Sequence, residues 1–63
     1  MEKEQDKSLL NEKEAAAFFG ASVKTLQAWR FQRKGPAYYK IGGFIRYAMP
    51  DLVKYAENRK IQV

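Results

Sequence analysis

The chain of 63 residues contains no cysteine and no histidine. The lack of cysteine excludes disulfides and thiolate metal sites, and the lack of histidine removes the usual acid or base at neutral pH. No apolar run approaches the ~20 residues that a membrane helix needs. A chain of this length buries roughly 60% of the surface that its unfolded form exposes, so we expect one domain with a small core.

Acidic residues are missing from the middle of the chain. None occurs between Glu14 and Asp51, whereas the same interval holds Lys24, Arg30, Arg33, Lys34, Lys40 and Arg46. The overall charge of +5 is therefore concentrated beyond the first fourteen residues, where five acidic and three basic side chains give a net charge of −2. A segment with charges of one sign indicates a polyanionic partner.

The two ends of the chain differ from its middle. The first eight residues are polar, mixed in charge and without apolar periodicity, and they do not resemble a secretory signal. We expect residues 1–8 to form a disordered tail, residues 9–60 one folded domain, and residues 61–63 a C-terminal tail. We also expect a cytoplasmic location.

Capping signals predict a first helix from about residue 12 to residue 19. Asn11 is a suitable N-cap, and Glu14 three residues later completes a capping box. Gly20 supplies the left-handed conformation that commonly ends a helix.

A second helix follows almost at once. Ser22 is its N-cap, and Val23, Leu26 and Trp29 recur at a spacing of three, which predicts a helix from about Val23 to about Arg33. Since the turn between the two helices is very short, we expect them to cross steeply, as in helix-turn-helix units.

The second half of the chain predicts a hairpin and a third helix. A Gly-Pro pair at 35–36 breaks the second helix, and β-favouring runs follow at 38–41 and 44–47. The Gly-Gly pair between these runs predicts a two-residue hairpin loop, because so tight a turn requires positive φ. Pro50 suits the first turn of a helix that runs to about Arg59. The expected fold class is mainly α with a small β-hairpin, a winged helix-turn-helix.

Large apolar residues at helical or strand spacing are assigned to the core. They are Phe19, Leu26, Trp29, Tyr47 and Leu52. Val53 and Ala56 are expected to face inward from the third helix. Phe31 falls off the face that carries Leu26 and Trp29, and the sequence leaves open whether it packs beneath the hairpin or is exposed.

Three side chains of the second helix project away from this core if Leu26 and Trp29 face it: Lys24, Gln27 and Arg30. A helix laid in a major groove roughly 12 Å wide presents such residues to base edges, so we expect them to read bases. Gln27 pairs with adenine, whereas Lys24 and Arg30 suit guanine or phosphate. We expect Arg30 to face solvent, so that Arg30→Ala weakens binding and leaves the fold intact. The alternative is a solvated helix face without a partner.

A second set of residues suits the DNA backbone. Ser22 places the first amides of its helix, with their positive dipole end, where a phosphate can dock. The residues expected at phosphates are Ser22, Thr25, Arg33, Lys34, Lys40, Gly43 and Arg46. The alternative for Arg46 is an ion pair with Glu14 or Asp51, and Gly43 is required by the turn in any case.

The order and spacing of these motifs resemble the excisionase and AlpA-like branch of MerR-type winged helices. The motifs are LNEKEAAAFFGASVKTLQAWR at 10–30, Gly-Pro at 35–36, KIGG at 40–43, IRY at 45–47 and Asp-Leu at 51–52. The resemblance implies that the second helix enters the major groove of double-stranded DNA and that the hairpin at 38–47 acts as a wing. It also implies a phage or plasmid excisionase or a small transcription regulator. Phe44 departs from the family, which commonly has a basic residue at the wing tip.

No enzyme, cofactor or metal is expected, because the seven acidic residues form no convergent pair and no Gly-rich phosphate loop opens a helix. The expected partner is double-stranded DNA in the nucleoid. A single domain covers only roughly 600–1,000 Å² of DNA, so we expect further copies on adjacent sites.

Two other functions are consistent with the sequence. The first is a protein-interaction module that docks on an integrase or polymerase through the third helix and the tail, with Tyr55, Ile61 and Val63. The second is stacking of single-stranded bases on Tyr38, Tyr39 and Phe44.

Overall fold

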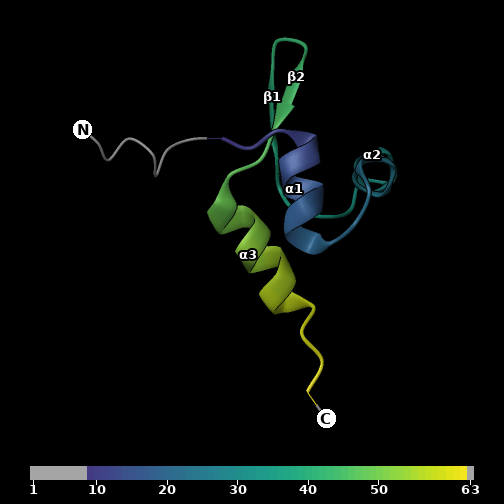
Figure 1. Ribbon diagram of the computed structural model, residues 1–63, viewed down its shortest axis with the longest axis vertical. Helices are drawn as coiled ribbons and strands as arrows, with labels where there is room; N and C mark the ends of the chain where they lie inside the picture. Colours follow the sequence, from purple (N-terminus) through teal and green to yellow (C-terminus); the bar gives the residue numbers. More distant parts are fainter. Residues whose placement is uncertain (1–8, 63) are drawn as a thin grey trace, which may run out of the picture.

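The computed structural model describes residues 9–62, which form three helices and one antiparallel hairpin (Figure 1). The elements are α1 (Glu12–Phe19), α2 (Val23–Phe31), β1 (Tyr39–Ile41), β2 (Phe44–Arg46) and α3 (Met49–Asn58). Their order confirms the expected fold class. The expected tail at 1–8 and Val63 lie outside the described residues.

Helix α1 begins and ends as its sequence predicts. The backbone amide of Glu14 donates to Oδ1 of Asn11 at 2.8 Å, and the amide of Asn11 donates to Oε1 of Glu14 at 2.9 Å, which completes the capping box. Gly20 then adopts a left-handed conformation with φ of 69°, and its amide bonds back to Ala17. This glycine redirects the chain from α1 into the turn before α2.

Helix α2 starts at its predicted cap and ends two residues earlier than predicted. The amide of Thr25 donates to Oγ of Ser22 at 3.2 Å, as expected for an N-cap. At the other end Arg33 has a left-handed backbone with φ of 60°, while its amide bonds to Arg30 and the next amide bonds to Trp29. These two bonds form a Schellman motif, so α2 ends at Phe31 instead of Arg33.

The hairpin is joined to the start of the domain by a further backbone pair. Gly42 takes φ of 59° in the two-residue loop, and Ile41 pairs with Phe44 across it. Leu10 and Tyr47 exchange two backbone hydrogen bonds of 2.7 and 2.8 Å. The base of the hairpin is therefore held beside the chain that enters α1.

The core lies between the helices and the base of the hairpin. Its buried residues are Ala15, Ala16, Leu26, Tyr47 and Leu52. Phe19, Trp29 and Tyr55 extend it as an aromatic cluster with centroids 5.6 to 6.0 Å apart. Tyr55 takes the place expected of Val53 and Ala56, both of which are exposed.

Gly35 lies directly against this aromatic cluster. A Cβ atom at Gly35 would come within 3.0 Å of Cβ of Trp29, and the φ of Gly35 is 96°. Only glycine fits here without displacing the loop that leads from α2 to the hairpin. In the described part of the chain, no helix has the length and apolar character needed to cross a membrane.

Candidate nucleic-acid interface

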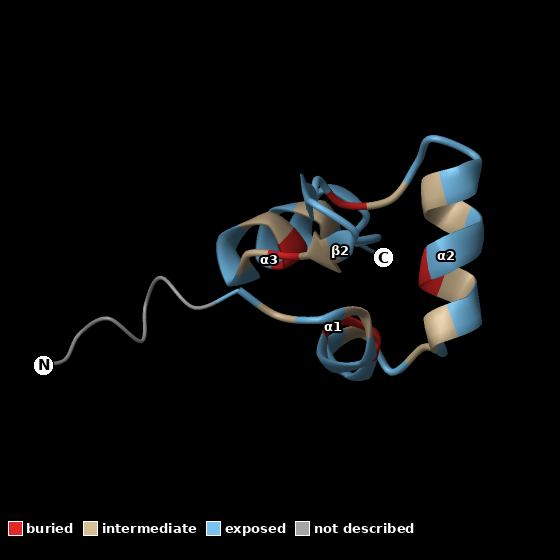
Figure 2. Ribbon diagram, turned by 90° about the horizontal axis from the view of Figure 1, so that it is seen from above, coloured by how far each residue is buried: buried red, intermediate tan, exposed pale blue. Residues whose placement is uncertain are grey.

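The outward face of α2 is a continuous exposed stripe. It consists of Lys24, Gln27, Ala28 and Phe31, at helical spacings of three and four residues. Leu26 on the opposite side of α2 is buried. Figure 2 shows α2 at one side of the molecule with its exposed surface turned outward. The stripe is therefore free to contact a partner along the whole helix.

Arg30 does not lie on this stripe. Its side chain is 25% exposed, and its Nη2 forms an ion pair of 2.5 Å with Glu12, which is 21% exposed. The guanidinium also lies over the ring of Tyr38, with its carbon 5.8 Å from the ring centroid. The expectation that Arg30 faces solvent is wrong, because this position of α2 turns toward the start of α1 and the loop before the hairpin.

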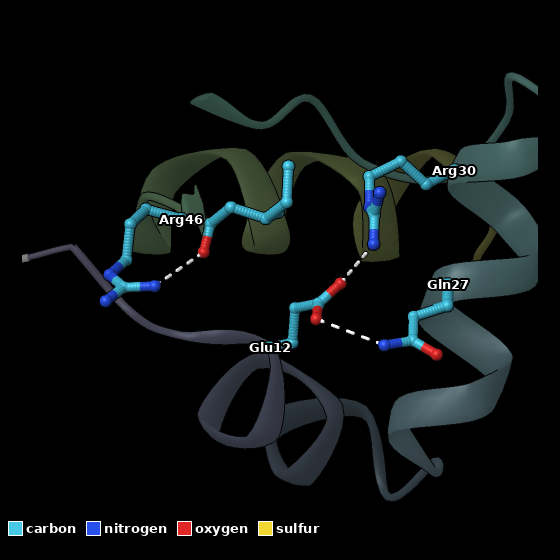
Figure 3. A network of polar contacts seen from close by, with 5 residues as sticks. Glu12, Gln27, Arg30 and Arg46 are labelled. Carbon is cyan, nitrogen blue, oxygen red and sulfur yellow. Dashed lines mark hydrogen bonds and ion pairs between the residues drawn. The ribbon is translucent and has the colours of Figure 1, made fainter. Parts of the chain in front are cut away.

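Glu12 connects the two helices through Arg30 and Gln27. Its Oε2 accepts from Arg30, while its Oε1 accepts from Nε2 of Gln27 at 3.3 Å (Figure 3). The hydrogen bond from Arg30 to this carboxylate raises the pKa of the guanidinium. Glu12 thus orients the amide of Gln27 and is itself neutralised by Arg30.

Tyr47 is buried beside Arg30. Burial raises the pKa of its hydroxyl, and the neighbouring Arg30 guanidinium opposes part of that shift. The hydroxyl therefore stays protonated at neutral pH. Sequence reasoning did not find Glu12, because 15 and 18 residues separate it from Gln27 and Arg30.

A first hollow lies at the end of α2, and we call it the α2 hollow. It is lined by Gln27, Arg30, Phe31, Arg33, Lys34, Gly35, Pro36, Ala37 and Tyr38. Arg33 and Lys34 are exposed at its rim, as expected for backbone contacts. Every charged side chain that lines this hollow is basic.

A second hollow, the hairpin hollow, lies between the start of α1, the start of α2 and the hairpin. It is lined by Asn11, Glu12, Lys13, Val23, Arg30, Lys40, Gly43, Phe44, Ile45 and Arg46. The structure therefore brings Lys40, Gly43 and Arg46 together, three residues that the sequence analysis assigned to phosphates. Arg30 borders both hollows.

Arg46 is held by its own strand. Its Nη1 donates to the carbonyl of Ile45 at 2.9 Å (Figure 3). Its guanidinium lies 5.0 Å from the centroid of the Phe44 ring. Glu14, one of the partners considered for it, is engaged in the capping box of α1. Arg46 also lines the hairpin hollow.

The start of α2 carries the other two candidates for phosphate contact. Ser22 is exposed, and its hydroxyl lies 3.1 Å from the hydroxyl of Thr25. Both side chains are thus gathered at the positive end of the helix dipole, where an anion is favoured.

The residues expected to serve the two alternative functions differ in their exposure. Tyr55 packs in the aromatic cluster, Ile61 is 85% exposed, and Val63 lies outside the described residues. Tyr38, Tyr39 and Phe44 are all exposed on or beside the hairpin.

Helices α1 and α2 cross steeply, as expected (Figures 1 and 2). Together with the exposed α2, its basic flanks and the adjacent hairpin, this arrangement defines a helix-turn-helix protein. A family model of the helix-turn-helix domain matches residues 9–60, and the chain belongs to this family. Membership supports DNA as the partner, and domains of this family are typically not enzymes. Among curated proteins, none matches the chain.

Proposed function

We propose that this protein binds double-stranded DNA in a sequence-specific manner, with α2 in the major groove and the β1–β2 hairpin as a wing. The observation that carries the proposal is the exposed α2 stripe, which contains no acidic residue and is bordered by the basic α2 hollow. The one acidic side chain beside α2, Glu12, is already paired with Arg30 within the described residues. A polyanion therefore meets no uncompensated negative charge there.

Base reading is assigned to Lys24, Gln27 and Arg30. Lys24 and Gln27 lie on the stripe and reach base edges directly, since the groove admits a helix. The amide of Gln27, held by Glu12 through one N–H, keeps its carbonyl oxygen and its second N–H for a base. Arg30 donates to Glu12 through Nη2 and buries its Nε, and its remaining terminal N–H groups are assigned to the DNA, which makes its contribution both structural and direct.

Phosphate contacts surround this base-reading stripe. The assigned residues at the two ends of α2 are exposed, apart from the half-buried Thr25, and those on the hairpin line the hairpin hollow. The assigned residues are Ser22, Thr25, Arg33, Lys34, Lys40, Gly43 and Arg46. Such contacts raise affinity and set the register without choosing a sequence.

The resemblance to the excisionase and AlpA-like branch supports a more specific role. In this proposal the protein is a phage- or plasmid-type excisionase or a small transcription regulator in the cytoplasm. An integrase or polymerase is the corresponding protein partner. The sequence motifs at 10–30 and 40–47 support this part of the proposal.

A selection of bound duplexes from random 20-base-pair DNA at two salt concentrations tests the function. If about four phosphates are neutralised, the affinity for a selected duplex falls with a log–log salt slope near −4. Lys34→Ala is expected to reduce the slope by about one, whereas Lys54→Ala is a matched control, because exposed Lys54 on α3 lines neither hollow.

The same selection examines base reading. Lys24→Ala and Gln27→Ala are expected to change the preferred sequence as well as the affinity. A salt-independent affinity would contradict DNA binding, and unchanged sequence preference in both variants would contradict major-groove reading by α2.

A further inference from the structure

Phe31 is the most exposed large apolar side chain in the described part of the chain, at 91%. It forms the last position of the α2 stripe, after Lys24, Gln27 and Ala28. The core leaves Phe31 uncovered, because the Schellman motif at Arg33 turns the chain away immediately after it. Its ring is therefore presented in the same direction as Lys24 and Gln27, two of the proposed base-reading residues.

The dimensions of the stripe match those of a DNA site. Seven residues separate Lys24 from Phe31, which corresponds to roughly 10 Å along a helix, or about three base-pair steps of 3.4 Å. Ala28 lies between them with a small side chain, so the middle of α2 can approach the base edges closely. Phe31 then falls about two base-pair steps beyond Gln27.

We propose that Phe31, together with Ala28, packs against the C5-methyl group of a thymine in the major groove. This inference rests on the proposed DNA-binding function and specifies one base of its site. The thymine methyl is the apolar group that the base edges present in this groove, and apolar side chains are its usual partners. Contact with the methyl removes apolar surface of both groups from water.

The charges around Phe31 favour DNA over a second copy of the protein. Arg30, Arg33 and Lys34 line the α2 hollow with Phe31, and the charged side chains of that lining are all basic. A second copy docked on the same surface would place like charges against one another. A DNA duplex supplies phosphates for these cations and a methyl group for the ring.

The test uses the full chain and the selected duplex, with each thymine replaced in turn by deoxyuridine, which lacks only the methyl group. For the wild type, one position is expected at which loss of the methyl weakens binding about fourfold, as for one buried methyl or methylene. Phe31→Ala is expected to bind the thymine and deoxyuridine duplexes equally. Ile61→Ala is the control, because Ile61 is 85% exposed, lines neither hollow and should leave the discrimination intact.

Several outcomes would overturn the inference. The first is that deoxyuridine weakens wild-type binding at no position, and the second is that Phe31→Ala still discriminates thymine from deoxyuridine. The third is that the wild type self-associates in sedimentation without DNA and Phe31→Ala does not. In any of these cases salt-dependent duplex binding would still stand. Absence of duplex binding by the wild type would overturn the proposed function as well. Thermal unfolding of Phe31→Ala should match the wild type, since the ring is almost fully exposed.

Discussion

Arg30 and Glu12 join the second helix to the start of the first through an ion pair that is only partly solvated, with exposed fractions of 25% and 21%. Arg30 also packs over Tyr38, so its side chain contributes apolar contact as well as charge. Its removal would leave the Glu12 carboxylate in a partly buried position with a single donor from Gln27. The residue therefore serves the fold as well as the proposed interface.

Arg30→Ala is accordingly expected to destabilise the protein by about 1 kcal/mol, because a partly buried ion pair and its packing are lost together. Urea denaturation followed by circular dichroism measures this change. Lys24→Ala is the control, since Lys24 is exposed on the stripe and its loss should leave the unfolding free energy unchanged. Equal unfolding free energies of Arg30→Ala and the wild type would contradict a structural role for Arg30 and favour a side chain that only faces solvent.

The C-terminal end of α2 carries backbone strain at an exposed basic residue. Arg33 adopts φ of 60°, a conformation that costs a residue with a Cβ atom about 1–2 kcal/mol and that glycine adopts readily. In a Schellman motif this position usually holds glycine. An arginine here lowers stability and places a cation at the rim of the α2 hollow.

Arg33→Gly should therefore stabilise the fold and weaken DNA binding at the same time. The expected gain in unfolding free energy is about 0.5–1 kcal/mol, after the greater entropy of glycine in the unfolded chain is subtracted. Denaturation and duplex titration measure the two effects. Arg33→Ala should weaken binding similarly without the gain in unfolding free energy, because alanine keeps the unfavourable φ. If Arg33→Gly bound the duplex as tightly as the wild type, Arg33 would not be a DNA contact.

The whole molecule is small, and its proposed base-reading surface lies on one short helix. Among the described residues, five buried ones form the core, and α2 has nine residues. A helix of this length spans only about three or four base pairs. A domain with so small a footprint should bind one isolated site weakly.

Cooperative binding to repeated sites is therefore expected. On duplexes with two copies of the selected site, occupancy should rise more steeply with protein concentration than on duplexes with one copy. Electrophoretic mobility shifts measure this, and insertion of five base pairs between the copies is the control, because it moves the second site to the opposite face of the duplex. Tight saturation of a single isolated site would contradict the prediction.

Short-range signals in the sequence were sufficient for the element order and for most helix ends. The Asn11–Glu14 capping box, the Ser22 cap and the left-handed Gly20 each depend on contacts within about five residues. The periodic placement of Leu26 and Trp29 likewise predicted that Lys24 and Gln27 are exposed, and they are. These features follow from backbone conformation and helical periodicity, which neighbouring residues specify locally.

Contacts between distant segments could not be predicted from these short-range signals. The Glu12–Arg30 pair and the Leu10–Tyr47 backbone pair join residues 18 and 37 positions apart, and they exist only because the helices and the hairpin pack at particular angles. Helical periodicity alone therefore put Arg30 on the solvent side and left Phe31 undecided. Packing turns Arg30 toward the carboxylate of Glu12 and leaves the Phe31 ring exposed beside Gln27 and Ala28. The local sequence specifies the helices and strands, whereas the burial of apolar surface specifies how they pack against one another.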